Sequence, residues 1–235
     1  MITRPELFLP AWLCLVLPVL FLIFVIAIII FFPAQIDPII ERENGLVELG
    51  TSIVLLPGIF TGVLIFRMRK NLPAPWLLYW LLIVTLGCVY IAGEEISWGQ
   101  QIWKWGTPEY FRMVNDQQET NIHNISSWFD QKPRILLELW ILVGGVILVL
   151  WRISKSINYR TRDWQYWFWP GVECFPAALI AILIRGPERY QSITGEWPLP
   201  VHVRFSEVQE FYFAVFLTLY LLSIYRKLTT KKIQN

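Results

Sequence analysis

The chain has 235 residues, of which 55% are hydrophobic and only 16% are charged. Soluble domains average about 25% charged residues, so this composition excludes an ordinary soluble globule. The formal net charge of +2 gives no basis for a nucleic-acid partner, and we expect none.

Long apolar runs predict the fold. A helix needs about 20 apolar residues to cross the hydrocarbon of a bilayer. Six runs approach or exceed this length, at about 7–33, 46–66, 75–93, 135–151, 164–184 and 207–225. Because they are continuous and do not alternate with polar residues, they favour helices over a membrane β-barrel. The sequence therefore predicts an all-α polytopic bundle, one integral membrane domain over residues 1–235, with the lipid bilayer as its surroundings.

The longest connection, residues 94–134, follows the third span. It is too long for a minimal turn, so we expect it to have structure of its own. Thr107-Pro108-Glu109 has an N-cap residue, a first-turn proline and an acidic residue in the order that starts a helix. Aromatic residues such as Trp103 and Trp105 favour the level of the lipid headgroups, so the segment is expected to lie along the membrane surface.

The distribution of charge predicts the orientation. If the N-terminus lies inside, 12 of the 20 Lys and Arg residues fall on the cytoplasmic side, where such residues concentrate. The same arrangement places 16 of the 18 acidic residues in outer connections or within spans. We therefore expect both termini in the cytoplasm and the segment 94–134 outside it.

Acidic residues at the outer ends of the spans need a specific explanation, because ionisable groups in a bilayer are costly and mark functional sites by default. Glu48 begins the second span, Glu94 and Glu95 end the third, and Glu207 and Glu210 begin the sixth. Clustered carboxylates repel one another unless they are protonated or neutralised, so a divalent cation of unknown identity is a natural hypothesis.

Residue spacing suggests which side chains share a face. If the third span continues as a helix, Glu94, Ser97, Trp98 and Gln101 lie on one side of it. Glu207 and Glu210 are three positions apart, and Glu119 and His123 are four apart, so each pair can converge on a helix. A carboxylate with an imidazole suits zinc, iron or manganese, whereas carboxylates with amide oxygens suit calcium or magnesium.

These patterns give a candidate site. The expected metal ligands are Glu94, Glu119, His123, Glu207 and Glu210. Glu94, Glu95 and His123 are the candidates for catalysis, and Ser97, Gln101 and Asn121 could orient substrate or water. The alternative is that the acids pair with arginines. The candidate partners are Arg112 and Arg134 for Glu94 and Glu95, and Arg185, Arg189 and Arg204 for Glu207 and Glu210.

Several motifs carry a resemblance to known proteins. ENGLVE at 43–48, GEEISWGQQ at 93–101, TPEYF at 107–111, QETNIHN at 118–124 and the helix at 206–227 together resemble a largely uncharacterised group of prokaryotic multipass membrane proteins. That resemblance implies a prokaryotic cytoplasmic (inner) membrane and no defined activity.

A fainter similarity is to the alkaline ceramidase superfamily of membrane hydrolases, which bind calcium near an early helix and a catalytic zinc through intramembrane histidines. It implies a separate cation site at Glu43, Asn44 and Glu48. The last helix carries Glu207 and Glu210 where that superfamily has histidines. The chain also has six predicted spans, whereas the superfamily has seven. Both differences argue against a zinc amidase.

Two functional hypotheses follow. The first is a metal-dependent membrane hydrolase, or another modifying enzyme, that acts on a lipid-linked substrate at the outer cavity. The second is a protein without enzymatic activity, either a scaffold that docks a membrane protein partner or a small transporter. Transporters often contain interrupted helices, and Pro170 and Pro176 bracket Glu173 in the fifth span.

Overall fold

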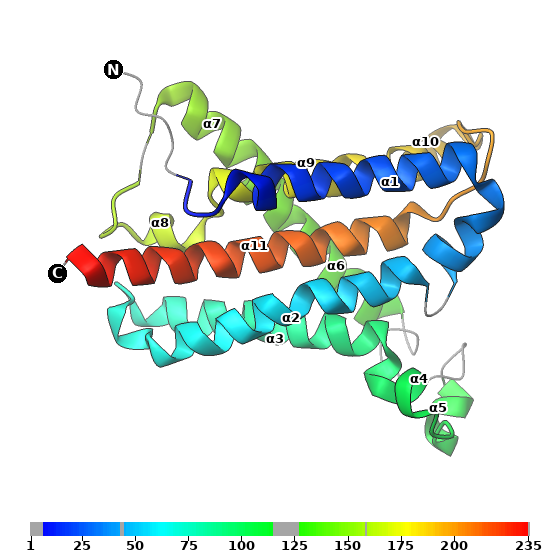
Figure 1. Cartoon of the computed structure of the whole chain (residues 1–235), viewed down its shortest axis with the longest axis horizontal. Coiled ribbons are helices and arrows are strands. Elements are labelled where there is room, and N and C mark those ends of the chain that lie inside the picture. Colours follow the sequence, from blue (N-terminus) through cyan, green and yellow to red (C-terminus); the bar gives the residue numbers. More distant parts are fainter. Residues whose placement is uncertain (1–6, 43–44, 115–126, 158, 235) are drawn as a thin grey trace.

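The computed structural model describes residues 7–42, 45–114, 127–157 and 159–234, and in these ranges it contains helices and no strands (Figure 1). Six helical segments are long and apolar enough to cross a membrane. They cover Trp12–Phe31, Leu46–Arg67, Pro75–Glu95, Gln131–Lys155, Trp164–Thr194 and Phe205–Thr230. The predicted all-α membrane bundle is confirmed, and the chain is an integral membrane protein.

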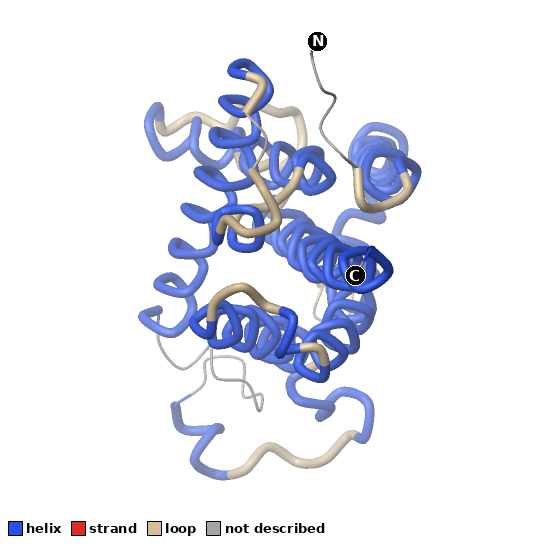
Figure 2. The backbone as a smooth tube through the Cα atoms, turned by 90° about the vertical axis from the view of Figure 1, so that its left-hand side faces the viewer, coloured by secondary structure: helices blue, strands red, loops and turns tan. Residues whose placement is uncertain are grey.

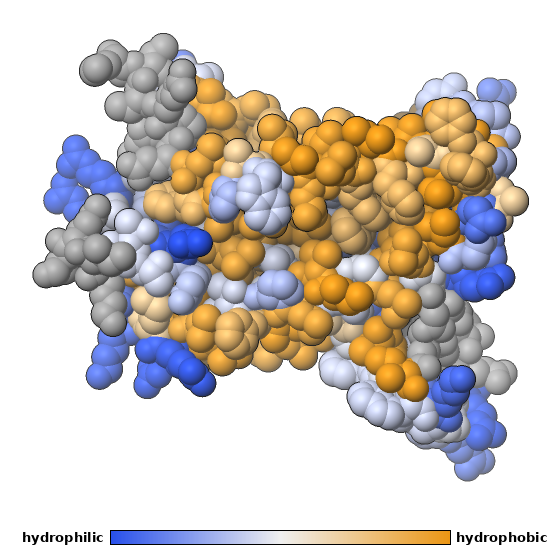
Figure 3. Space-filling model, in the orientation of Figure 1, coloured by the Kyte–Doolittle hydropathy of each residue, from blue (hydrophilic) through white to orange (hydrophobic). Residues whose placement is uncertain are grey.

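The bundle has two distinct ends. The first described residues, the connection between α2 and α3, and the end of α11 lie together on the left of Figure 1, and we call this the terminal end. The connections that follow α1, α3 and α10 lie at the opposite end, which we call the acidic end. Hydrophobic residues cover the middle of the visible face, and charged residues gather at both ends (Figure 3). This apolar band is the surface that a bilayer would cover.

Helices α2 (Leu46–Arg67) and α3 (Pro75–Glu95) run side by side in opposite directions. Proline at the first position of α3 suits the start of a helix, because its missing N–H would have no partner there. Gly58 of α2 packs against Thr218 and Gly62 against Thr85, so a methyl group at either position would meet the neighbouring helix. The small residues of this GxxxG pattern permit close helix packing, as expected in a membrane.

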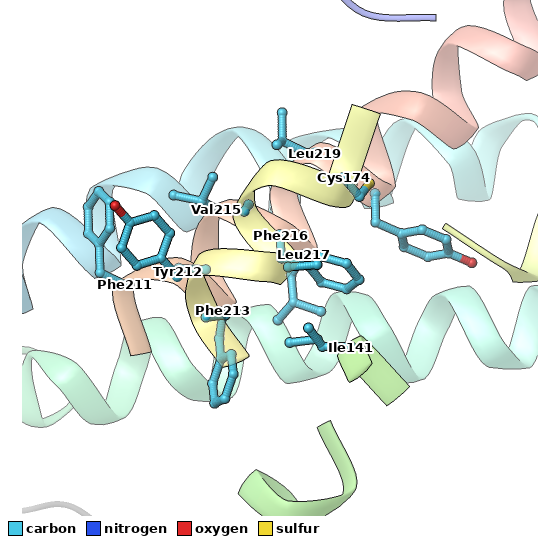
Figure 4. Packing of buried hydrophobic residues seen from close by; sticks show 14 of the residues in the cluster. Ile141, Cys174, Phe211, Tyr212, Phe213, Val215, Phe216, Leu217 and Leu219 are labelled. Carbon is cyan, nitrogen blue, oxygen red and sulfur yellow. The ribbon is translucent and has the colours of Figure 1, made fainter. Parts of the chain in front are cut away.

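Helix α11 (Phe205–Gln234) forms the centre of the bundle and packs most extensively against α2 and α9 (Phe175–Leu183). It is buried on nearly all sides, which explains why its apolar residues do not form a single stripe. Figure 4 shows its buried side chains directed to several sides of the helix, among them Phe211, Tyr212, Phe213, Val215, Phe216, Leu217 and Leu219.

The other spans surround α11. The first span contains α1 (Leu17–Phe31), which is largely exposed and therefore lies at the periphery. The fourth joins α6 (Ser127–Trp140) to α7 (Leu148–Lys155) through one π-helical stretch, Ile141–Ile147. The fifth is divided into α8 (Trp164–Phe168), α9 and α10 (Gly186–Thr194).

A short arm projects beside the bundle at the acidic end (Figures 1 and 2). It contains α4 (Gln100–Trp103) and α5 (Glu109–Val114), so the helix start predicted at Thr107-Pro108-Glu109 is present. Trp103 and Trp105 stack at 6.0 Å between ring centroids, and both are exposed. The position of these aromatic rings relative to lipid stays a prediction.

Candidate functional site

Three helices bring four acidic residues together at the acidic end. Glu48 lies in the first turn of α2, Glu95 is the last residue of α3, and Glu207 and Glu210 lie in the first turns of α11. The Glu95 carboxyl lies within hydrogen-bonding reach of that of Glu210 and interacts electrostatically with Glu48 and Glu207. We call these four residues the carboxylate cluster. The convergence predicted from helix ends is therefore present for residues of the second, third and sixth spans.

The contact between Glu95 and Glu210 constrains the protonation of the cluster. An ionised carboxylate can only accept hydrogen bonds, so a hydrogen bond between two carboxyl groups requires a proton on one of them. Glu95 is only 8% exposed, which deprives it of most contact with water. Close contact of two carboxyl groups in such a place is favourable only when a proton or a cation neutralises part of their charge.

Arginines compensate part of the remaining charge. Arg134 Nη1 lies 2.7 Å from Glu210 Oε1, and Arg204 Nη2 lies 2.9 Å from Glu207 Oε1. The acids thus both converge and pair with arginines, so the two alternatives derived from the sequence occur together. Arg134 was expected beside Glu94 or Glu95, yet it binds the neighbouring carboxyl of Glu210 instead.

Two of the other candidate arginines have different partners. Arg185 pairs with Glu188, which lies three residues later in α10, and Arg189 pairs with Glu138 of α6. The first ion pair is local to the start of α10, and the second connects α10 to α6. In the described part of the chain, Arg134 and Arg204 form ion pairs with the cluster.

Gln209 is a site residue that the sequence patterns did not identify. It is fully buried, its Oε1 accepts a hydrogen bond from Arg134 Nη2, and its Nε2 donates to the carbonyl of Ala181. Arg134 Nη2 also donates to the carbonyl of Ser206. Gln209 therefore connects α9 to the arginine that binds Glu210. Its place between two acids in SEVQE is the only signal that could have indicated this role.

The chain after Glu95 does not continue as a helix, so the predicted shared face of Glu94, Ser97, Trp98 and Gln101 is wrong. Ser97 and Trp98 have left-handed backbone angles with φ of 45° and 54°, and Gly99 follows with φ of 94°. Glycine adopts this region without steric cost, whereas Ser97 and Trp98 adopt it at a steric cost because they carry side chains.

Glu94 and Trp98 are nevertheless connected by a different geometry. Trp98 Nε1 donates a hydrogen bond to Glu94 Oε1 at 2.5 Å. Glu94 and Glu95 are both buried, but consecutive helix residues point about 100° apart, and the two carboxyls have different partners. Glu95 is the member of the pair that contacts Glu210. Ser97 is buried beside this turn, and the side chain of Gln101 is outside the described part of the chain.

Other predicted site residues lie outside the described residues. They are Glu43 and Asn44 of the separate cation site, and Glu119, Asn121 and His123 of the outer segment. In the described ranges, no three His, Cys, Asp or Glu side chains are grouped so that they could hold a metal ion. The metal site and the catalytic roles therefore stay predictions.

Comparison with known proteins does not add to this geometry. No model of a known protein family matches the chain, and no match is found among curated proteins or solved structures. The resemblances suggested by the sequence motifs stay predictions, and the function has to be argued from the residues of the site.

Proposed function

We propose that Glu95 and Glu210 share a proton and that the carboxylate cluster binds a divalent cation in exchange for it. One observation supports this above others, namely that four carboxyl groups from three helices meet at one end of a membrane bundle. Like charges held together in this way are costly unless a proton or a cation neutralises them. Carboxylate oxygens are also the ligands that calcium, magnesium and manganese prefer.

The exchange follows from the present arrangement of the cluster. A proton shared by Glu95 and Glu210 would lie between their carboxyl groups, and Arg134 holds one Glu210 oxygen. A cation that uses both carboxylates as ligands must displace that proton, so binding should release it to the solvent. Glu48 and Glu207 also interact with Glu95, but no three of these carboxyl groups are arranged as metal ligands in the structure, so the cation would have to draw a third one closer.

The reaction that this site would serve is hydrolysis, or a related modification, of a lipid-linked substrate. A bound divalent cation can activate water and polarise a carbonyl or phosphoryl oxygen. The cluster lies at the ends of three spans, which is the depth at which a lipid headgroup meets the protein. We further propose that this end faces outward from a prokaryotic inner membrane, with both termini in the cytoplasm.

A small transporter is the second candidate, and the divided fifth span favours it. Transporters use discontinuous helices to form ion sites inside the bilayer. Span five is interrupted between Phe168 and Val172, where Trp169 and Gly171 have extended backbone angles. A docking scaffold would use the exposed aromatic arm at 100–114 instead, and would need neither a cation nor this interruption.

Cation binding is tested by elemental analysis of detergent-purified protein, followed by calorimetric titration with Mn²⁺ in two buffers of different ionisation enthalpy. The wild-type protein should bind close to one ion and release a proton. Glu95→Gln/Glu210→Gln should lose binding, because the amides cannot supply the negative charge. The matched control is Glu109→Gln/Glu196→Gln, which removes two exposed carboxyls and should retain binding.

Two results would reject the proposal: absence of Mn²⁺, Ca²⁺ and Mg²⁺ binding by the wild-type protein, or equal binding by the two double variants. The reaction is tested separately by incubating the metal-loaded protein with phospholipids and polyprenyl phosphates and analysing products by mass spectrometry. Ion flux without lipid products in proteoliposomes would favour the transporter, and capture of a defined membrane protein through residues 100–114 would favour the scaffold.

A further inference from the structure

The interruption of span five leaves backbone carbonyls inside the bundle, and side chains from other spans bind them. Pro170 cannot donate a backbone hydrogen bond, so the helix of α8 cannot continue through it. Tyr220 of α11 donates from its hydroxyl toward the carbonyls of Trp167 and Phe168, at 3.0 and 3.1 Å. Unpaired carbonyls in a bilayer would be costly, so these contacts permit the chain to be broken at this depth.

Two basic side chains donate hydrogen bonds to carbonyls at the same interruption. Arg152 Nη2 donates to the carbonyl of Pro170 at 2.6 Å, and Lys227 Nζ donates to the carbonyl of Tyr166 at 3.0 Å. Lys227 is only 5% exposed and also lies 4.7 Å from the centroid of the Tyr166 ring. Lys227 thus binds a backbone oxygen just before the break, and Arg152 binds one within it.

Glu173 lies directly after the break and has no such partner. Its side chain is 1% exposed, and neither carboxyl oxygen has a hydrogen-bond partner among the described residues. The side chain folds back over Gly171, since a methyl group at Gly171 would overlap its carboxyl group. A buried carboxyl group without a donor is rare in folded proteins and calls for a functional explanation.

The surroundings of Glu173 come from four parts of the chain. Arg152 of α7 and Lys227 of α11 interact with it electrostatically, as do Cys174 on its own turn and Cys14 of the first span. Tyr159 faces Arg152, with the guanidinium 5.3 Å from its ring centroid. The two cations attract a negative charge on Glu173, but they donate their hydrogen bonds elsewhere.

We propose that Glu173 is a proton-binding site in the interruption of span five, on the terminal side of the bundle. A charged carboxylate there would lack hydrogen-bond donors among the described residues, whereas a neutral carboxyl group would lack the attraction of Arg152 and Lys227. Each form is stabilised by one feature of the site and opposed by the other, so the group can exchange a proton. A metal or alkali cation is disfavoured because it would have to bind beside two positive charges.

This inference does not depend on the cation site at the acidic end. It assigns a second site, with a proton as ligand, to the part of the fold that favours transport. Its chemistry can be tested with dicyclohexylcarbodiimide, an apolar reagent that adds to protonated carboxyl groups in apolar surroundings. The carboxyl oxygen bonds to the central carbon of the reagent, and the proton moves to a reagent nitrogen. Acyl migration then gives a stable N-acylurea, with no leaving group and no change of oxidation state.

The experiment treats the purified full-length protein with this reagent from acidic to alkaline pH and maps the modified residues by peptide mass spectrometry. We expect labelling of Glu173 that decreases severalfold as the pH rises, and none at this position in Glu173→Gln. Lys227→Met should increase labelling at a given pH, because it removes a charge that favours the carboxylate. Labelling of Glu95 in the same samples reports on the other site and keeps the two proposals separate.

A matched control is Glu196, which is exposed and should react with a water-soluble carbodiimide but not with the apolar reagent. No labelling of Glu173 at any pH would overturn the proposal, since it would identify a permanently charged group. Labelling that does not change with pH would also overturn it, because the carboxyl would then be permanently neutral. Protection of Glu173 by Na⁺ or Li⁺ at constant ionic strength would reassign the site to an alkali cation.

Discussion

Arg134→Gln should destabilise the acidic end, because this side chain connects the fourth span to the start of α11. Its Nη1 pairs with Glu210 at 2.7 Å, and its Nη2 donates to Gln209 Oε1 at 3.1 Å and to the carbonyl of Ser206 at 3.2 Å. Glutamine is too short to reach all three acceptors. The substitution also removes the cation that compensates Glu210.

The size of the effect can be worked out from these contacts. Neutral hydrogen bonds between membrane helices contribute about 0.6 kcal/mol on average, and charge-assisted ones are about twice as strong. Three such contacts would give roughly 3–4 kcal/mol, but the Glu210 side chain is 30% exposed, so solvent screens part of the ion pair. We therefore expect the free energy of unfolding to fall by about 2–3 kcal/mol.

The assay is unfolding in mixed micelles by sodium dodecyl sulfate, followed by tryptophan fluorescence, since the chain has 13 tryptophans. A double-mutant cycle with Glu210→Gln should give a coupling energy of about 1 kcal/mol. The control is Arg112→Gln in the exposed helix α5, which should change stability by less than about 0.5 kcal/mol. Equal effects of the two arginine substitutions, or a coupling energy near zero, would refute the ion-pair reasoning.

Three further predictions test the packing, the interrupted span and the arm. Gly58→Ala should destabilise by about 1–3 kcal/mol, because the added methyl would lie 3.2 Å from the Thr218 Cα, whereas Gly87→Ala meets nothing within 4 Å and should be neutral. Tyr220→Phe should lower the free energy of unfolding by about 1–3 kcal/mol, because it removes the hydroxyl that binds the Trp80 indole N–H and two carbonyls. The control is Tyr79→Phe at an exposed position, and equal unfolding curves for the two variants would contradict the prediction. A spin label at Met113→Cys in the arm should be more accessible to oxygen than to a water-soluble nickel complex, unlike a label at the exposed Glu196→Cys. The three native cysteines are buried and should not react with the label. Equal accessibility at both labelled sites would place the arm in water.

The membrane architecture could be predicted because its cause is local. A helix that satisfies its own backbone needs only a sufficiently long apolar run to cross a bilayer, and such runs are visible in the sequence. The convergence of Glu95 with Glu207 and Glu210 followed from the same logic, because acids at the ends of neighbouring spans share one depth. The position of each acid at the end of an apolar run, rather than any pairing rule, made that prediction possible.

The choice of partners could not be predicted, because it depends on how helices rotate against one another. Glu94 and Glu95 are adjacent in the sequence, yet the rotation of α3 brings Glu95 to Glu210 and Glu94 to the indole N–H of Trp98. The turn that ends α3 depends on left-handed angles at Ser97 and Trp98, two residues that rarely adopt them. Prolines beside Glu173 indicated an interruption of the span. The hydrogen bonds from Arg152 and Lys227 to the carbonyls of that interruption depend on how α7 and α11 pack against it, which the sequence does not show.

The two acidic sites should act independently, and α11 provides the reason. Glu210 and Lys227 are 17 positions apart on this helix, which corresponds to about 26 Å. Four of the hydroxyls between them are directed to backbone carbonyls: Tyr212 to Pro18, Thr218 to Val54, Tyr220 to Trp167, and Ser223 to Tyr220.

The first three of these hydroxyls link α11 to another helix, and the Ser223 hydroxyl bonds the backbone of α11 itself, so none of the four is directed to the next polar side chain along the helix. Since most of the remaining side chains on this stretch are apolar and buried, the described residues provide no continuous path for a proton between the two ends. Glu95→Gln should consequently leave the pH dependence of Glu173 labelling unchanged. A shift of that dependence in Glu95→Gln, with the fold intact, would mean that a rearrangement of α11 couples the two ends, as alternating access in a transporter requires.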